Sequence, residues 1–226
     1  KGDVIVLEDP TFLTALQAFG PFQARYLTVP MDDQGMQVDL LPEILEKNEV
    51  KFIYTIPNFQ NPTGITLSLE RRKKLVEIAD HYGVPIVEDD PYGELRFSGQ
   101  ALPSLKSMDS SQNIIYLSSF SKVLSPGLRV AALVAPSGVM EKLVFAKQAA
   151  DLHTSILAQM IANEFFRRGF LPSHLAVVNE VYRSRCSVML RALETYFPAG
   201  VTWSRPEGGF FIWVTLPEKM NATELF

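Results

Sequence analysis

Short apolar runs alternate with helical patterns along the first 134 residues, and this alternation restricts the fold more than any other feature of the sequence. Most of the runs are apolar throughout, which is typical of strands buried on both faces of a sheet. Buried strands separated by helices predict an α/β fold with a mainly parallel sheet sandwiched by helices. The expected strands cover residues 4–7, 25–29, 52–56, 84–87, 114–117 and 130–134.

The helix that the sequence defines best lies between Ser68 and Gly83. Ser68 is a suitable N-cap, Glu70 stands in the first turn, and Gly83 follows the last turn as a stop. The basic residues 71–74 are expected on a mostly solvated face of this helix rather than at a nucleic-acid site. The apolar face consists of Leu69, Leu75, Val76, Ile78, Ala79 and Tyr82.

The second half of the chain has a different pattern. Helical periodicity dominates from residue 139 to about residue 197, and the run Pro206-Glu207-Gly208-Gly209 then introduces a strand at residues 210–214. The aromatic residues of this strand alternate, so we expect them to form its core and to have no other role. They are Phe210, Phe211 and Trp213.

Two units are expected along the chain. Residues 1–197 form a large domain with a connecting helix, its N-terminal part absent, and residues 198–226 form the truncated start of a small α/β domain. Because the sequence opens directly on a strand and ends inside the start of another helix, we expect a fragment of a longer protein.

Composition excludes several classes of function. The net charge is -4, and no clustered basic tract provides a nucleic-acid surface. No apolar run approaches the roughly 18 residues that a membrane-spanning helix needs. The chain has a single cysteine, Cys186, which excludes an internal disulfide and fits a cytoplasmic location. We expect Cys186 to be a small, partly buried apolar residue. The three histidines lack the spacing of metal ligands, so no metal site is expected.

Polar segments follow three of the predicted strands. Asn61 comes after the strand at 52–56, residues 88–92 follow the strand at 84–87, and Ser119 to Lys122 follow the strand at 114–117. Ligand-binding groups of a parallel sheet gather at the carboxyl ends of its strands. A neutral lysine amine can form a Schiff base with a carbonyl, and the hydroxyls and guanidinium around Lys122 suit a phosphate. Taken alone, the lysine segment fits a solvated polar loop better than a binding site, and the other segments reverse that interpretation.

Three motifs together give a resemblance. Pro57-Asn58-Phe59-Gln60-Asn61-Pro62-Thr63-Gly64, Glu88-Asp89-Asp90-Pro91-Tyr92 and the segment from Ser119 to Arg129, in this order, resemble the fold-type I aminotransferases of class I/II. The resemblance implies a pyridoxal 5′-phosphate (PLP) cofactor and ping-pong exchange of an amino group between an amino acid and a 2-oxo acid. The motifs look most like the branch acting on 2-aminoadipate, kynurenine or aromatic amino acids. A homodimer is implied for the full-length protein.

The resemblance also implies a role for each anchor. Lys122 forms the Schiff base and moves the substrate proton, and Asp89 pairs with the pyridine nitrogen; its spacing to Tyr92 favours it over Asp90. Tyr92 and Asn61 hydrogen-bond the ring phenolate oxygen. The implied phosphate ligands are Ser119, Ser121 and Arg129, and Pro91 packs on one face of the ring.

Two further features stay open at this stage. Residues 151–155 resemble a loop that these enzymes present across a dimer interface, although an ordinary helix start explains them equally well. An arginine for the substrate α-carboxylate is expected beyond residue 226, so the amino-acid substrate cannot be read from this chain.

Two other functions remain as alternatives. One is the PLP-sensing, aminotransferase-like domain of a winged-helix transcription regulator, although Asn61-Pro62-Thr63-Gly64 is more typical of the enzymes. The other is a PLP-dependent lyase or decarboxylase on the same scaffold.

Overall fold

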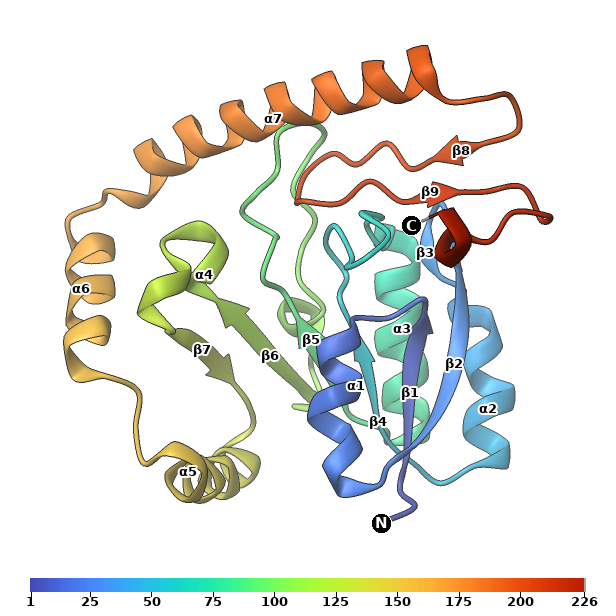
Figure 1. Ribbon diagram of the computed structural model, residues 1–226. Helices are drawn as coiled ribbons and strands as arrows, with labels where there is room; N and C mark the ends of the chain where they lie inside the picture. Colours follow the sequence, from blue (N-terminus) through green and yellow to red (C-terminus); the bar gives the residue numbers. More distant parts are fainter. Residues whose placement is uncertain (226) are drawn as a thin grey trace.

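The computed structural model describes residues 1–225 and contains a seven-stranded sheet (Figure 1). The strand order is β3-β2-β1-β4-β5-β6-β7. The five central strands are parallel, whereas β3 and β7 pair antiparallel with their neighbours. The predicted mainly parallel sheet is therefore confirmed. The strands are β1 (Val4–Asp9), β2 (Arg25–Asp32), β3 (Gly35–Met36), β4 (Val50–Thr55), β5 (Ile86–Asp89), β6 (Ile114–Ser119) and β7 (Ala131–Val134).

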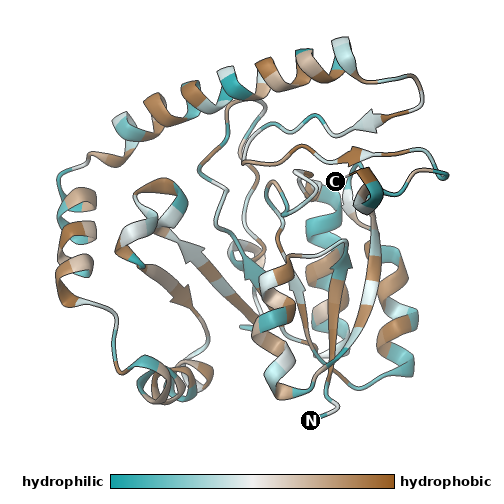
Figure 2. Ribbon diagram, in the orientation of Figure 1, coloured by the Kyte–Doolittle hydropathy of each residue, from teal (hydrophilic) through white to brown (hydrophobic). Residues whose placement is uncertain are grey.

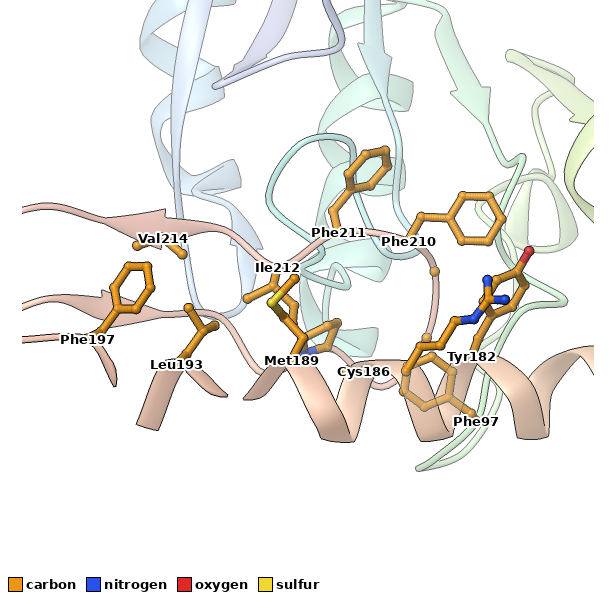
Figure 3. A pocket seen from close by; sticks show the side chains of 14 residues that line it. Phe97, Tyr182, Cys186, Met189, Leu193, Phe197, Phe210, Phe211, Ile212 and Val214 are labelled. Atoms are coloured by element: carbon orange, nitrogen blue, oxygen red, sulfur yellow. The ribbon is translucent and has the colours of Figure 1, made fainter. Parts of the chain in front are cut away.

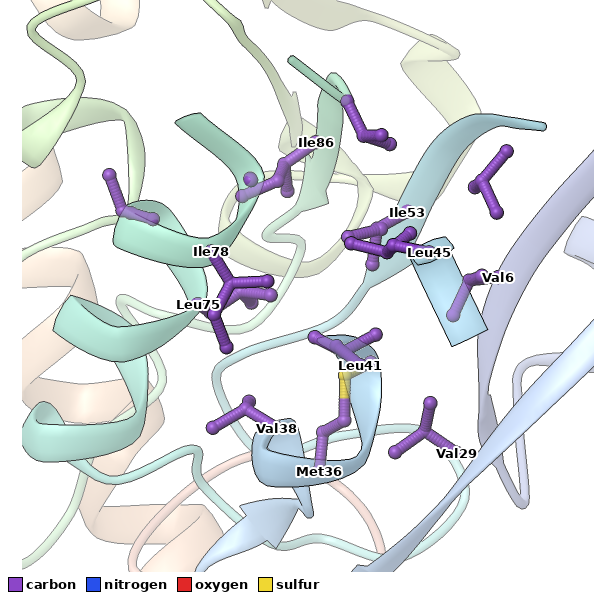
Figure 4. Packing of buried hydrophobic residues seen from close by; sticks show 14 of the residues in the cluster. Val6, Val29, Met36, Val38, Leu41, Leu45, Ile53, Leu75, Ile78 and Ile86 are labelled. Carbon is purple, nitrogen blue, oxygen red and sulfur yellow. The ribbon is translucent and has the colours of Figure 1, made fainter. Parts of the chain in front are cut away.

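Helices cover both faces of the sheet. Alternate strand residues divide into two buried clusters: Val4 and Val6 pack with α2 and α3, while Ile5 and Leu7 pack with α1 and α7. Figure 4 shows the first cluster, and Figure 2 shows the hydrophobic character of the strands. The helices are α1 (Leu13–Phe19), α2 (Leu41–Lys47), α3 (Leu69–Tyr82), α4 (Phe120–Val123), α5 (Ser137–Asp151), α6 (Ile156–Arg167) and α7 (Leu171–Tyr196); short 3-10 turns cover Gly20–Phe22, Val38–Leu40, Lys106–Met108, Pro126–Leu128 and Ala222–Leu225.

Helix α3 begins and ends as the sequence predicts, but its basic run is placed differently. The Ser68 hydroxyl accepts a hydrogen bond from the Arg71 amide, and Gly83 ends the helix at φ 65°. The prediction of a mostly solvated run is wrong for Arg72, which is fully buried. Its guanidinium donates to the carbonyl oxygens of Pro57, Leu67 and Pro103 and to the Asn58 side chain. Loop carbonyls without a secondary-structure partner explain this burial, because they require donors.

The other residues of the basic run differ from one another. Arg71 forms a bidentate ion pair with Asp32, with both distances 2.6 Å, and is only partly exposed. Lys73 and Lys74 are exposed, as predicted.

The chain after β7 is far more open than the sheet. Helices α5, α6 and α7 follow one another around β6 and β7 (Figure 1), and none of the α5 residues is buried. A separate two-stranded antiparallel sheet follows, made of β8 (Thr202–Trp203) and β9 (Val214–Thr215). Within residues 1–225 no helix is both long and apolar enough to cross a membrane.

The predicted strand at residues 210–214 is wrong except at Val214, where β9 begins. The preceding segment instead docks on the large sheet unit: Gly209 N–H donates to the Leu95 carbonyl, and Gly208 forms an isolated bridge with Arg96. The contact leaves no room for a side chain. A Cβ at Gly208 would lie 2.3 Å from Phe59 Cζ, and one at Gly64 would lie 2.3 Å from the Phe211 carbonyl oxygen.

Candidate functional site

The carboxyl ends of β4, β5 and β6 lie side by side, because these strands are parallel neighbours in the sheet. Each end carries one of the polar segments singled out from the sequence. Asn61 lies in the loop after β4, Asp89 is the last residue of β5, and Lys122 lies in α4, directly after β6. The geometry thus brings the three segments to one edge, as expected for groups that bind a common ligand.

Asp89 is held by a single hydrogen bond. The Tyr54 hydroxyl of β4 donates to Asp89 Oδ2 at 2.6 Å, and no other donor within residues 1–225 reaches this carboxylate. Burial raises the pKa of Asp89, while the Tyr54 hydrogen bond lowers it. One carboxylate oxygen is therefore left without a protein partner on the face that carries α1 and α7.

Asp90 has quite different surroundings, although it is the next residue. Its carboxylate accepts hydrogen bonds from Asn58 Nδ2 at 3.0 Å, Gly93 N at 2.9 Å and the Tyr116 hydroxyl at 3.2 Å. These contacts join the loop after β4 to the loop after β5. The contacts assign Asp90 to the fixing of loops, whereas Asp89 keeps an oxygen available for a ligand.

Tyr92, Asn61 and Lys122 are linked through one aromatic ring. Burial raises the pKa of the Tyr92 phenol, and the neighbouring Asn61 side chain lowers it by a smaller amount. The Phe210 ring packs edge-on against Tyr92 at 5.6 Å, and Lys122 Nζ lies 5.7 Å from the Phe210 centroid. Residues from three loops and from the segment before β9 therefore converge at the same place.

The proposed phosphate ligands are also neighbours. Arg129 Nη1 donates to Ser121 Oγ at 3.4 Å, and Ser119 Oγ accepts from the Ser121 amide at 3.3 Å. Arg129 is exposed and has φ 53°, a left-handed conformation that turns the chain back towards α4. The cluster joins one cation with two hydroxyls, which is the chemistry that an anionic phosphate requires.

Glu8 of β1 holds the loop that carries Asn61 through hydrogen bonds. This fully buried carboxylate accepts from Thr55 Oγ1, from the Ile56 amide and from Gln60 Nε2, and burial raises its pKa to about 7. The Gln60 oxygen in turn accepts from the amide and the hydroxyl of Thr63, at 2.9 and 2.7 Å. Glu8 and Gln60 thus hold both ends of the turn around Asn61.

Sequence reasoning missed three contributors to this site. Tyr54 and Glu8 lie inside strands, where they read as ordinary strand residues, although a carboxylate within an apolar run is a detectable signal. Phe210 was assigned to a strand core alone; its contacts with Tyr92 and Lys122 correct that prediction. Its ring also contacts Tyr182 of α7, on the border of a cavity of about 760 Å³ between α7 and the segment that leads to β9 (Figure 3).

Residues 151–155 run from the last residue of α5 through the loop to the N-cap of α6. Ser155 caps α6 by accepting a hydrogen bond from the Ala158 amide, which satisfies the helix-start interpretation. Asp151, His153 and Thr154 line a hollow of about 410 Å³ together with Arg129. The loop therefore borders the proposed phosphate ligands. Among residues 1–225 no group of three or more His, Cys, Asp or Glu residues is arranged to bind a metal.

Comparisons with known proteins find relatives that match nearly the whole chain. The chain is 47% identical over 225 residues to aromatic-amino-acid aminotransferase 1 of Thermococcus litoralis, covering 97% of this chain and 54% of that protein. The solved structure of kynurenine aminotransferase from Pyrococcus horikoshii, in complex with PMP, superposes with a TM-score of 0.97 at 44% identity, covering 99% of this chain and 57% of that one. The chain thus spans about half the length of the relatives it matches.

A relative of a different class is also similar. An uncharacterized HTH-type transcriptional regulator of Bacillus subtilis, YisV, is 37% identical over 226 residues, covering 100% of this chain and 47% of that protein. The family model for aminotransferases of class I and II matches residues 1–226. By sequence and by fold, this chain belongs to the aminotransferase class I and II family.

Proposed function

We propose that the full-length protein is a PLP-dependent aminotransferase that moves an amino group between an amino acid and a 2-oxo acid. The observation that carries the proposal is the convergence of a lysine, a carboxylate with a free oxygen and a cation–hydroxyl cluster at one sheet edge. These three elements match the three polar parts of PLP: its carbonyl, its ring nitrogen and its phosphate. When bound, PLP serves as an electron sink for a carbanion at the substrate Cα.

The residues present fit this cofactor. Arg129, Ser121 and Ser119 would hold the phosphate, and the free Asp89 oxygen would accept a hydrogen bond from the protonated ring nitrogen. Tyr92 and Asn61 would donate to the ring phenolate oxygen. Burial raises the pKa of Tyr92, so its hydroxyl stays protonated and remains a donor at neutral pH.

Lys122 would link the protein covalently to the cofactor and later move the proton at the substrate Cα. An amine does this in its neutral form, next to groups that position the donor and the acceptor. The Phe210 ring lies beside the Lys122 amine, with its centroid 5.7 Å from Nζ.

The Lys122→Ala variant of the full-length protein tests this function. Amino transfer to a 2-oxo acid is expected to fall by about 10³-fold or more, because proton transfer and covalent capture both use this amine. The melting temperature should stay near that of wild type. Lys147→Ala, which removes an exposed lysine of α5, is the matched control and should retain full activity. Equal transfer rates in the wild type and the Lys122→Ala variant would exclude the proposed role.

The substrate class is inferred from the relatives. Donors with an aromatic or 2-aminoadipate side chain are expected to react fastest, since the relatives include an aromatic-amino-acid aminotransferase, a 2-aminoadipate transaminase and a kynurenine aminotransferase. A panel of amino acids, each tested at limiting concentration, ranks them by kcat/KM.

We further propose a homodimer and a cytoplasmic location. Large apolar side chains of α5 and α6 are exposed, among them Phe145, Leu157 and Met160, and a partner surface would cover them. A single cysteine fits a reducing compartment. Sedimentation of the full-length protein gives the oligomeric state, and fractionation of the native cells gives the location. We also propose a domain boundary near residue 197, supported by the separate β8–β9 sheet that follows α7.

A regulatory protein is the second candidate, because YisV is similar over the whole chain. In that case the same site would bind PLP as a signal. Binding of the full-length protein to DNA, together with the absence of amino transfer for every donor tested, would favour the regulator.

A further inference from the structure

We propose that Tyr54 is a positioning residue that holds Asp89 in place and leaves one oxygen of this carboxylate free for the ring nitrogen of the cofactor. The inference rests on the proposed function, because it concerns the carboxylate assigned to that nitrogen. Tyr54 is not one of the polar anchors of the motifs. Its role follows from its contacts alone.

The strand register places Tyr54 where its hydroxyl reaches Asp89. Tyr54 of β4 pairs with Val87 of β5, and Asp89 lies two residues further along β5 on the same face. The phenol therefore extends along the sheet towards its carboxyl edge. It donates to Asp89 Oδ2 at 2.6 Å, the one hydrogen bond that this carboxylate receives within residues 1–225.

Packing prevents the phenol from turning away. Tyr54 is only 3% exposed, and the Phe19 ring of α1 meets it edge-on at 5.8 Å. Phe19 also contacts Phe52, the next residue of β4 on the same face, at 5.4 Å. Because the ring is enclosed, the direction of the hydroxyl is fixed, and Asp89 is fixed with it.

The charges around the pair show what the hydrogen bond does. Burial raises the pKa of Asp89, and the neighbouring Asp90 raises it further, whereas the bond from Tyr54 lowers it. Burial and the Asp89 charge raise the pKa of Tyr54 itself, with smaller contributions from Glu8 and Tyr92, so the phenol remains a donor. Tyr54 thus favours the ionised carboxylate at a place where burial disfavours it.

The test is Tyr54→Phe in the full-length protein, which removes the hydroxyl and keeps the ring. The dissociation constant for PLP, measured by equilibrium dialysis, is expected to rise about tenfold, in line with a lost hydrogen bond to a charged group. The pH midpoint of the absorbance change of the bound cofactor should move upwards, because a weaker positive charge on the ring nitrogen repels the proton near Lys122 less. kcat should fall, with KM for the 2-oxo acid unchanged.

Tyr26→Phe is the matched control. The Tyr26 hydroxyl donates to the Leu16 carbonyl at 3.3 Å, on the same face of the sheet but away from Asp89. This variant should leave both the dissociation constant and the pH midpoint at their wild-type values. A purely structural role of Tyr54 would instead make the two variants behave alike.

A double-mutant cycle with Asp89→Asn keeps the inference open to refutation even if one variant is poorly stable. The Tyr54→Phe change should add almost nothing to the loss already caused by Asp89→Asn, because its effect passes through Asp89. Additive losses, or a wild-type midpoint in Tyr54→Phe, would overturn the role of Tyr54 alone. Failure of the wild-type protein to bind PLP would overturn the proposed function, and the role of Tyr54 with it.

Discussion

At the carboxyl edge of the sheet, the carboxylates on one face are hydrogen-bonded within the protein, whereas the carboxylate on the other face keeps a free oxygen. On the α3 side, Glu8 and Glu88 are fully buried, and each accepts hydrogen bonds from the backbone of a loop. Asp90, at the same edge, is held by three donors. On the α1 side, Asp89 has one partner and Lys122 extends over an aromatic ring.

The difference shows how one edge can be both rigid and reactive. Carboxylates whose partners lie within the protein fix the loops, so they have no oxygen to offer a ligand. The carboxylate of the other face is oriented by a single tyrosine and keeps binding capacity. If this comparison is right, mutations on the two faces will separate stability from chemistry.

The largest effect is expected from Arg72→Met, which removes the buried cation of the α3 side. The free energy of unfolding should fall by about 3–5 kcal/mol, because four carbonyl-type acceptors and the nearby Glu88 and Asp90 lose their donor or counter-charge. Urea denaturation of the full-length protein measures the change. The control, Lys73→Met on the exposed side of the same helix, should stay within about 0.5 kcal/mol of wild type.

The second-largest effects are expected when each of the two neighbouring aspartates is replaced separately by asparagine. Asp89→Asn should lower kcat by about 10²- to 10³-fold with little loss of stability, since it removes the charge opposite the ring nitrogen. Asp90→Asn should instead lower the free energy of unfolding by about 1–3 kcal/mol, because its donors lose a charged acceptor. Parallel kinetics and urea curves of both variants decide, and a reversed pattern would contradict the comparison.

The last effect is the smallest per pH unit, and it is a slope in the dependence of the free energy of unfolding on pH. Burial raises the pKa of both Glu8 and Glu88 from 4.5 to about 7. Between these values the folded protein binds protons that the unfolded chain has released, so its stability falls as the pH rises, by about 1.4 kcal/mol per pH unit for each group. Glu8→Gln should make this slope shallower by about 1.4 kcal/mol per pH unit, which corresponds to one proton. Glu49→Gln, at an exposed site, should leave the slope unchanged.

The fold could be predicted largely because it depends on patterns that are local in sequence. Apolar runs marked six of the seven strands of the sheet, and Ser68 and Gly83 marked the ends of α3. The antiparallel direction of β7 was not predicted, because residues 120–130, which contain α4 and a 3-10 turn, form a connection whose length does not distinguish the two directions.

The chemistry of the site was only partly readable. Polar residues at or just after the ends of apolar strands, such as Asp89 and Lys122, are conspicuous in the sequence. Tyr54 and Phe210 were missed because aromatic residues fill cores everywhere, and only the register of β4 against β5 and the docking of the chain before β9 give them partners. Arg72 was misplaced because the carbonyl groups that it satisfies come from two loops far apart in the sequence, one after β4 and one after β5.

The glycines at the docking contact have a consequence of another kind. Gly64 and Gly208 each meet a neighbour at a distance where a methyl group would collide, with the Phe211 backbone in one case and the Phe59 ring in the other. Neither glycine offers a group to a ligand. Even so, the turn that carries Asn61 and the segment that carries Phe210 can pack against each other only if both positions lack a side chain. Mutational tolerance along this chain should therefore drop as sharply at these two inert positions as at the residues that perform the chemistry.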